Sequence, residues 1–338
     1  MAKLNTIETT EMHTGGEPLR IIEKGYPEIK GNTILDKIRY LRENQDMYRK
    51  FLMWEPRGHY DMYGVLLVLP DIESADFGTI FLHNEGYGTM CGHAVIALGR
   101  YAVDKGLVKN PQTPETKINI QCPCGLVEAY VEYDGVKTEN VRFQSVPSFV
   151  YATDVDVEVE GFGTVKVDVV YGGTFYAIVP AERYGLNVRK SSVDELRRAA
   201  GTTTDSLRRS YKVEHPESPD LEFIFGTIMT DGKDEFSDDP TANMCVFAER
   251  EVDRSPCGSG VTARTALQYY KGHRKIGQKR RFRGPSGAMF TTSVVKEVTY
   301  GKYKNAVVVE VSGKGHYVGS SKFTLEDDDE IGQGFILR

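Results

Sequence analysis

Short stretches of alternating apolar and polar residues make up most of the chain, and each stretch ends at glycine, proline or aspartate. This pattern predicts β-strands separated by turns, with few long helices. The predicted strands cover residues 63–69, 79–82, 117–121, 126–132, 141–147, 155–159, 165–171, 175–179, 223–230, 242–247, 288–295 and 306–311.

Two polar segments have helical spacing. Residues 33–52 place apolar side chains on one approximate face, which predicts an amphipathic helix. Residues 192–212 begin with Ser192 and Glu195 at the spacing of a capping box. Because Gly201 interrupts the second pattern, a helical hairpin is predicted there.

Two further helices are predicted from apolar runs that follow a repeated motif. Thr89-Met90-Cys91-Gly92-His93 precedes one run and Ser255-Pro256-Cys257-Gly258-Ser259 precedes the other. Both runs end at a Lys-Gly pair whose glycine lies fifteen residues after the cysteine (106 − 91 and 272 − 257). The repeat predicts two paired halves that present two thiols to one site.

A thiol at a helix N-terminus lies beside unpaired backbone N–H groups, which lower its pKa and attract anions such as carboxylates. The glycine after each cysteine lets a ligand approach the backbone. Two such helix ends could hold a carboxylate and place one sulfur on each face of the adjacent carbon. That geometry suits removal of a proton from one face of a chiral Cα and its return to the other.

Other interpretations of the cysteines remain. Cysteine is often simply buried, and a redox disulfide is a further alternative, although the C-x-x-C spacing is missing. Cys122 and Cys124 could share a metal, but no His or Cys cluster completes a tetrahedral set, so packing is the better interpretation for them and for Cys245. We therefore expect no metal site.

Composition excludes several classes of protein. The length of 338 residues suits about two domains, and a net charge of −6 argues against a nucleic-acid partner. No apolar stretch approaches the ~20 residues of a membrane span, and Met1–Asn5 lacks the apolar region of a signal peptide. The five scattered cysteines fit free thiols in a reducing compartment, which predicts a cytoplasmic protein. No G-x-G-x-x-G or P-loop motif is present, so a nucleotide cofactor is not expected.

The two cysteine motifs resemble the signatures of the proline racemase superfamily, which includes proline racemase, 4-hydroxyproline 2-epimerase and trans-3-hydroxy-L-proline dehydratase. The resemblance extends over essentially the whole chain, through segments 12–18, 55–59, 61–64, 171–173 and 231–234. It implies an α/β protein of diaminopimelate-epimerase-like fold, with two pseudo-symmetric halves, each a curved and mainly antiparallel sheet around a central helix. The active site would lie in the cleft between them.

We predict that residues 1–146 form the first half, to which residues 312–338 return, and that residues 147–311 form the second. The resemblance also implies a homodimer that binds a small-molecule substrate, proline or hydroxyproline, and works without pyridoxal phosphate, metal or any other cofactor.

By the same resemblance, Cys91 and Cys257 would be the catalytic acid–base pair. Backbone N–H groups of four residues would bind the substrate carboxylate, Asp253 would bind the ring nitrogen, and two aromatic residues would face the pyrrolidine ring. The carboxylate-binding residues would be Gly92, His93, Gly258 and Ser259, and the aromatic residues Tyr63 and Phe247. His93 could otherwise be a structural cap, and Asp253 could instead pair with Arg254 or cap the turn.

One departure separates two activities. Segments 83–87 and 122–125 resemble the animal-type trans-3-hydroxy-L-proline dehydratases, which carry Thr in place of the second cysteine, whereas Cys257 is present here. Because both bases are in place, the prediction is a cofactor-independent racemase or 2-epimerase of proline or hydroxyproline. The alternative is a dehydratase that uses Cys91 as its base. A third hypothesis is a carboxylate-binding or thiol-redox protein without turnover.

Overall fold

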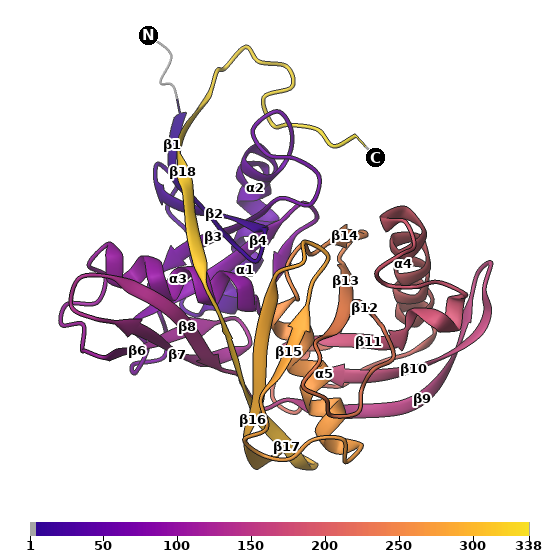
Figure 1. Cartoon of the computed structure of the whole chain (residues 1–338). Coiled ribbons are helices and arrows are strands. Elements are labelled where there is room, and N and C mark those ends of the chain that lie inside the picture. Colours follow the sequence, from indigo (N-terminus) through magenta and orange to yellow (C-terminus); the bar gives the residue numbers. More distant parts are fainter. Residues whose placement is uncertain (1–4, 338) are drawn as a thin grey trace.

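The computed structural model describes residues 5–337, so most of the segment Met1–Asn5 and Arg338 lie outside it. Two successive sets of strands follow each other along the chain (Figure 1). The first set is β1 (Asn5–Thr14), β2 (Glu17–Lys24), β3 (Tyr63–Val68), β4 (Phe77–His83), β5 (Tyr87–Gly88), β6 (Glu115–Cys122), β7 (Gly125–Tyr133) and β8 (Thr138–Gln144). The second is β9 (Phe149–Val159), β10 (Gly163–Tyr171), β11 (Phe175–Pro180), β12 (Ile224–Thr230), β13 (Thr241–Phe247), β14 (Glu251–Val252), β15 (Arg280–Arg283), β16 (Met289–Tyr300), β17 (Tyr303–Gly313) and β18 (Gly315–Leu325).

The two sets repeat one order of pairings. In the first, β1–β2 is antiparallel, β2–β3 parallel, β3–β4 antiparallel, β4–β6 parallel, and β6–β7 and β7–β8 antiparallel. The second follows the same order from β10–β11 through β11–β12, β12–β13, β13–β15 and β15–β16 to β16–β17. The pairings therefore match strand by strand, with two halves that correspond to the repeat in the sequence.

Strand exchange ties the halves together. β9 follows β8 in the chain but pairs with β10, and β18 follows β17 but pairs with β1 (Figure 1). β8 and β17 also pair with each other. The predicted boundary at residue 147 falls between β8 and β9, and the one at residue 311 falls two residues before the end of β17.

Each half contains a central helix that follows a cysteine. These helices are α3 (Gly92–Asp104) and α5 (Gly258–Tyr270), and nearly every residue of both is buried. Small and apolar residues occur on all sides of the two helices, as expected of helices enclosed by a sheet. The connections between the parallel pairs β2–β3 and β11–β12 carry the remaining helices, α1 (Ile34–Tyr40) and α2 (Asp46–Met53) in the first half and α4 (Val193–Ser210) in the second.

Two helix predictions need correction. The helix expected over residues 33–52 is divided by a π-helical turn at Leu41–Gln45. The hairpin expected over residues 192–212 is instead the single helix α4, although the capping box of Ser192 and Glu195 is present. Gly201 lies inside that helix, where a Cβ would lie 2.6 Å from the Cγ of Arg250. Its lack of a side chain therefore makes room for Arg250 and does not form a turn.

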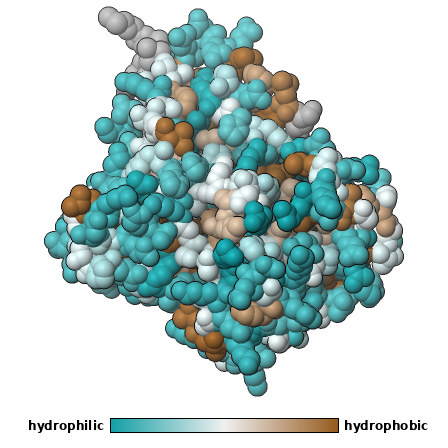
Figure 2. Space-filling model, in the orientation of Figure 1, coloured by the Kyte–Doolittle hydropathy of each residue, from teal (hydrophilic) through white to brown (hydrophobic). Residues whose placement is uncertain are grey.

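No helix within residues 5–337 is both long and apolar enough to cross a membrane. Hydrophilic residues cover most of the face in Figure 2, and hydrophobic residues form small separate groups there.

Candidate active site

The N-termini of α3 and α5 meet at their first residues. A Cβ on Gly92 would lie 2.6 Å from the Cα of Gly258, which is closer than Cβ atoms approach other heavy atoms. Only glycine at both positions allows the two helix ends to touch. As a result, the unpaired N–H groups of both helices lie around one small cavity.

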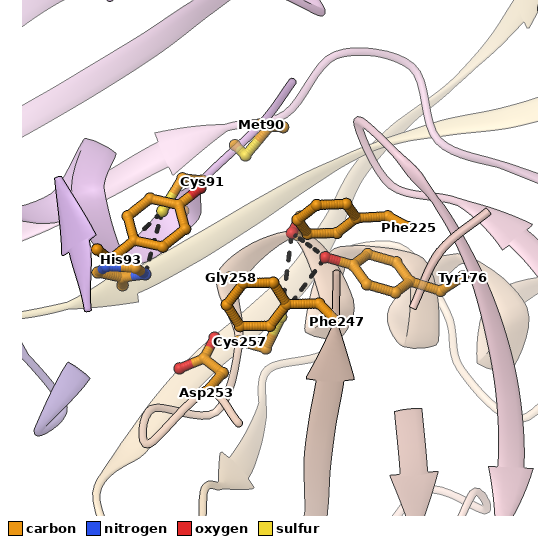
Figure 3. A pocket seen from close by; sticks show the side chains of 12 residues that line it. Met90, Cys91, His93, Tyr176, Phe225, Phe247, Asp253, Cys257 and Gly258 are labelled. Carbon is orange, nitrogen blue, oxygen red and sulfur yellow. Dashed lines mark hydrogen bonds between the residues drawn. The ribbon is translucent and has the colours of Figure 1, made fainter. Parts of the chain in front are cut away.

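Twelve residues line this cavity, and they include every site residue expected from the sequence (Figure 3). Cys91 and His93 lie on one side, and Cys257, Phe247 and Asp253 lie on the other. The full set is Tyr63, Met90, Cys91, Gly92, His93, Tyr176, Phe225, Phe247, Asp253, Cys257, Gly258 and Ser259. The structure thus brings both cysteine motifs to one place.

The two cysteines have different backbone conformations. Cys91 precedes α3 with an extended φ of −143°. Cys257 precedes α5 with a φ of +67°, in the left-handed region that non-glycine residues rarely adopt. Such strain is retained mainly at functional sites. The symmetry predicted for the thiols therefore holds for their position but not for their backbone.

His93 orients the Cys91 thiol. Its Nδ1 lies 3.1 Å from Cys91 Sγ, and its Nε2 lies 3.2 Å from the carbonyl oxygen of Pro18. A carbonyl only accepts, so Nε2 carries the proton and Nδ1 accepts from the thiol. Burial lowers the pKa of His93 to about 3, so the ring is neutral near pH 7.

Burial also changes the expected chemistry of Cys91. The sequence predicted a thiol pKa lowered by the helix N-terminus, and the Ala94 N–H does act in that direction. Desolvation outweighs it and raises the pKa of Cys91 well above its usual value, with the charges of Asp253 and Cys257 adding to the rise. Near pH 7, Cys91 in this closed cavity is therefore a protonated thiol, able to donate to His93.

The surroundings of Cys257 mirror those of Cys91 with other residues. Ser259, like His93, lies two positions after its cysteine, and its Oγ is 2.8 Å from the hydroxyl of Tyr176. Tyr176 is the second residue of β11, as Pro18 is of the matching β2. The Tyr176 hydroxyl also lies 3.8 Å from Cys257 Sγ.

Asp253 lies in the turn before Cys257 and is buried. Its Oδ1 accepts the Ser255 N–H at 2.7 Å, so the carboxylate does cap this turn. Arg254 directs its guanidinium to Asp61, 2.5 Å away, instead of to Asp253. Burial raises the pKa of Asp253 to about 6. Asp253 thus forms no direct ion pair among the described residues, although the nearby charge of Arg254 partly offsets the rise in its pKa, and it faces the cavity.

Aromatic rings close the cavity. Tyr63 and Phe247 meet edge to face at 6.1 Å between ring centroids, and Phe225 stacks on Phe247 at 5.2 Å. The Tyr63 hydroxyl forms a hydrogen bond with the Cys91 thiol, and burial raises the pKa of this phenol well above its usual value. Tyr63 therefore retains its proton.

Sequence reasoning missed three lining residues: Met90, Tyr176 and Phe225. Met90 was within the quoted motif. Phe225 lies near the start of β12, as Tyr63 does at the start of β3, so carrying the repeat into the strands would have identified it. No group of three metal-ligating side chains occurs within residues 5–337, and Cys122 and Cys124 are buried in the core.

Known proteins are similar to this chain over nearly its whole length, and a solved structure shares its fold. A dehydratase from Xenopus tropicalis, trans-L-3-hydroxyproline dehydratase, is 56% identical over 98% of this chain and 95% of its own. The 3-hydroxyproline 2-epimerase of Burkholderia multivorans is 43% identical over 98% of both chains. The crystal structure of a hydroxyproline epimerase from Agrobacterium vitis with bound trans-4-OH-L-proline has a TM-score of 0.90 at 27% identity, covering 98% of this chain and 96% of that one.

A match to a protein family agrees with the two cysteine motifs and with the two halves of matching strand order. The model of the proline racemase family matches residues 9–336, nearly the entire sequence. The chain belongs to the proline racemase family.

Proposed function

We propose that this protein is a cofactor-independent 2-epimerase of hydroxyproline or proline. One observation carries the proposal: two thiols lie at the touching N-termini of two buried helices and line the same cavity. A two-base inversion at Cα needs an acid and a base on opposite faces of one carbon. The similar chains named as epimerases support the substrate class.

In this proposal, backbone N–H groups of Gly92, His93, Gly258 and Ser259 bind the substrate carboxylate. Such groups carry partial positive charge at helix N-termini, and here they come from both helices. The Asp253 carboxylate accepts from the ring ammonium, which supplies the direct ion pair that this buried acid does not form within the protein. Tyr63 and Phe247 pack against the ring. Cα then lies between Cys91 and Cys257, one of which removes the proton while the other returns one.

Dehydration of trans-3-hydroxy-L-proline is the second candidate, and specific observations favour it. Similar proteins named as dehydratases are 51–56% identical to this chain and cover 97–98% of it. In the trans isomer, the 3-hydroxyl and the α-hydrogen lie on the same ring face. The leaving hydroxyl therefore departs on the side of the base, where the Tyr63 hydroxyl contacts Cys91 and retains its proton. In this candidate reaction, Cys91 removes the α-proton and the Tyr63 phenol protonates the departing 3-hydroxyl.

The experiment incubates the protein in D₂O separately with L-proline, trans-4-hydroxy-L-proline and trans-3-hydroxy-L-proline. Optical rotation, deuterium at Cα and the dehydrated imine product are followed together. Inversion with deuterium uptake supports the epimerase. Dehydration of the 3-hydroxy substrate, without inversion of the other two, replaces it with the lyase. Absence of exchange on every substrate contradicts both.

Cysteine variants test the roles of the two thiols. Cys257→Ser should lower inversion by at least ~10²-fold, the scale of a lost general acid or base. Cys124→Ser, which alters a buried thiol outside the cavity, is the matched control. Full inversion by Cys257→Ser would refute the two-base mechanism. Under the lyase candidate, Cys91→Ser stops dehydration, whereas Cys257→Thr retains it.

We also propose, from the family likeness, that the protein is a homodimer, and from its five free thiols that it acts in the reducing cytoplasm. Light scattering after gel filtration tests the first point; a monomeric mass contradicts it. Fractionation of the source cells tests the second; recovery from an oxidising compartment contradicts it.

A further inference from the structure

Cys245 is a buried thiol that the proposed reaction does not use. It lies in β13 between Asn243 and Phe247. Alternate residues of a strand point to the same face. The Asn243 amide donates to the carbonyl of Pro256 at 2.9 Å, and Phe247 lines the cavity with Cys257. The Cys245 side chain therefore points toward the start of α5, where Cys257 lies.

Contacts around Cys245 confirm this placement. The Cys245 thiol has hydrogen-bond contacts with the Cys257 thiol and with Tyr176. Its carbonyl accepts the Asp253 N–H at 3.1 Å, which ties this part of β13 to the turn before Cys257. Two thiols from different elements are thus held beside each other.

We propose that Cys245 is a site of oxidative modification, at which it forms a disulfide with Cys257 and switches the enzyme off. The reaction partner is hydrogen peroxide. This inference depends on the proposed function in one respect: Cys257 must become a thiolate, as it does during turnover. The thiolate is the form that reacts with peroxide.

The chemistry balances in two steps. The Cys257 thiolate attacks one peroxide oxygen, the O–O bond breaks, and hydroxide leaves; Cys257 becomes a sulfenic acid and peroxide is reduced. The Cys245 thiol then attacks that sulfur, the S–O bond breaks, and water leaves as the S–S bond forms. The net reaction oxidises two thiols to one disulfide and reduces one peroxide to two waters.

Cys91 is the competing partner for Cys257. It lies on the other side of the cavity (Figure 3). There its thiol contacts His93 and Tyr63. The Cys245 thiol contacts the Cys257 thiol directly, and we therefore assign Cys245 as its disulfide partner.

The test treats the full-length protein with hydrogen peroxide, blocks remaining thiols under denaturing conditions and maps disulfides by peptide mass spectrometry. We expect a Cys245–Cys257 linked peptide and restoration of both thiols by dithiothreitol. This readout needs no substrate, so it stands apart from failure of the proposed function. A Cys91–Cys257 peptide in its place, or no linked peptide, overturns the proposal.

Variants test the consequence for activity. In Cys245→Ala and Cys245→Ser, peroxide should carry Cys257 to sulfinic acid, which dithiothreitol does not reduce. Recovery of Cα exchange should then fall at least ~tenfold relative to the wild type. Cys122→Ser, another buried thiol, is the control and should recover as the wild type does. Equal recovery by the Cys245 variants and the wild type overturns the proposal, and the serine variant covers the case in which alanine fails to fold.

Discussion

Gly92 and Gly258 touch backbone to backbone where α3 and α5 begin: a Cβ on Gly258 would lie 2.4 Å from the Cα of Gly92. Neither helix can move away without separating the N–H groups that surround the cavity. The glycine that follows each cysteine thus determines the distance between the two halves of the site, besides allowing a ligand close to the backbone.

Gly258→Ala should therefore damage both stability and activity. The added methyl group meets backbone, which cannot rotate away, so the two helix ends must separate. We expect unfolding in urea to show a loss of about 1–3 kcal/mol, the usual cost of overpacking, and Cα exchange to fall more than tenfold. Gly319→Ala is the control, because a Cβ there meets no atom within 4 Å. Equal stability of the two variants would show that α3 and α5 can separate freely.

His93→Ala should leave the Cys91 thiol without its nitrogen acceptor and the Pro18 carbonyl without a donor. Each buried group left unpaired costs about 1–3 kcal/mol, so stability and Cα exchange both fall. His93→Asn offers an acceptor and a donor on a shorter side chain and should restore part of the exchange. Exchange rates and urea midpoints are measured for both variants. If asparagine performs no better than alanine, the hydrogen bond to Cys91 is not the function of His93.

The acid limb of kcat/KM should follow Asp253. Its pKa is raised to about 6 by burial, so below that pH the carboxyl becomes neutral and loses its attraction for the ring ammonium. Rates should fall as the pH drops through 6, and Asp253→Asn should be slow at all pH values and lack this limb. A limb that persists in Asp253→Asn would assign it to another group.

The same carboxyl has the opposite effect on folding stability. Its folded pKa lies above its unfolded value of about 4, so the folded state binds the proton more tightly. The stabilisation from this group is present below pH 4 and is lost as pH rises to about 6. The free energy of unfolding is measured by urea titration at several pH values between 4 and 6. Over this range it should fall more steeply with rising pH in the wild type than in Asp253→Asn.

Tyr63→Phe separates the two candidate reactions. The change removes only the hydroxyl that contacts Cys91 and keeps the ring against His93 and Phe247. Loss of a general acid should lower dehydration of trans-3-hydroxy-L-proline about 10²-fold or more, with a smaller effect on deuterium exchange at Cα. Equal losses of dehydration and exchange would place Tyr63 in substrate binding alone.

Much of the architecture was accessible from local pattern. Twelve of the strands and both central helices follow from alternation and from the Cys-Gly motif, because each of these elements obeys its own periodicity. Six strands were not predicted: β1, β2, β5, β14, β15 and β18. The π-helical turn at Leu41–Gln45 and the continuous helix α4 were not accessible. From local sequence alone, Gly201 predicts a break in the helix. Only the tertiary structure shows that Arg250, from another segment, occupies the space that a side chain at this position would fill.

The repeat of Cys91 and Cys257, with glycine after each, was determined by the sequence alone, and with it the convergence of two helix ends on one cavity. Tertiary structure decided how the two thiols differ. Burial outweighs the helix N-terminus at Cys91, the backbone of Cys257 is held in the left-handed region, and Cys245 and Tyr176 arrive beside Cys257 from separate strands. Desolvation, backbone strain and contacts between distant segments exist only after the chain has folded, so no local pattern encodes them.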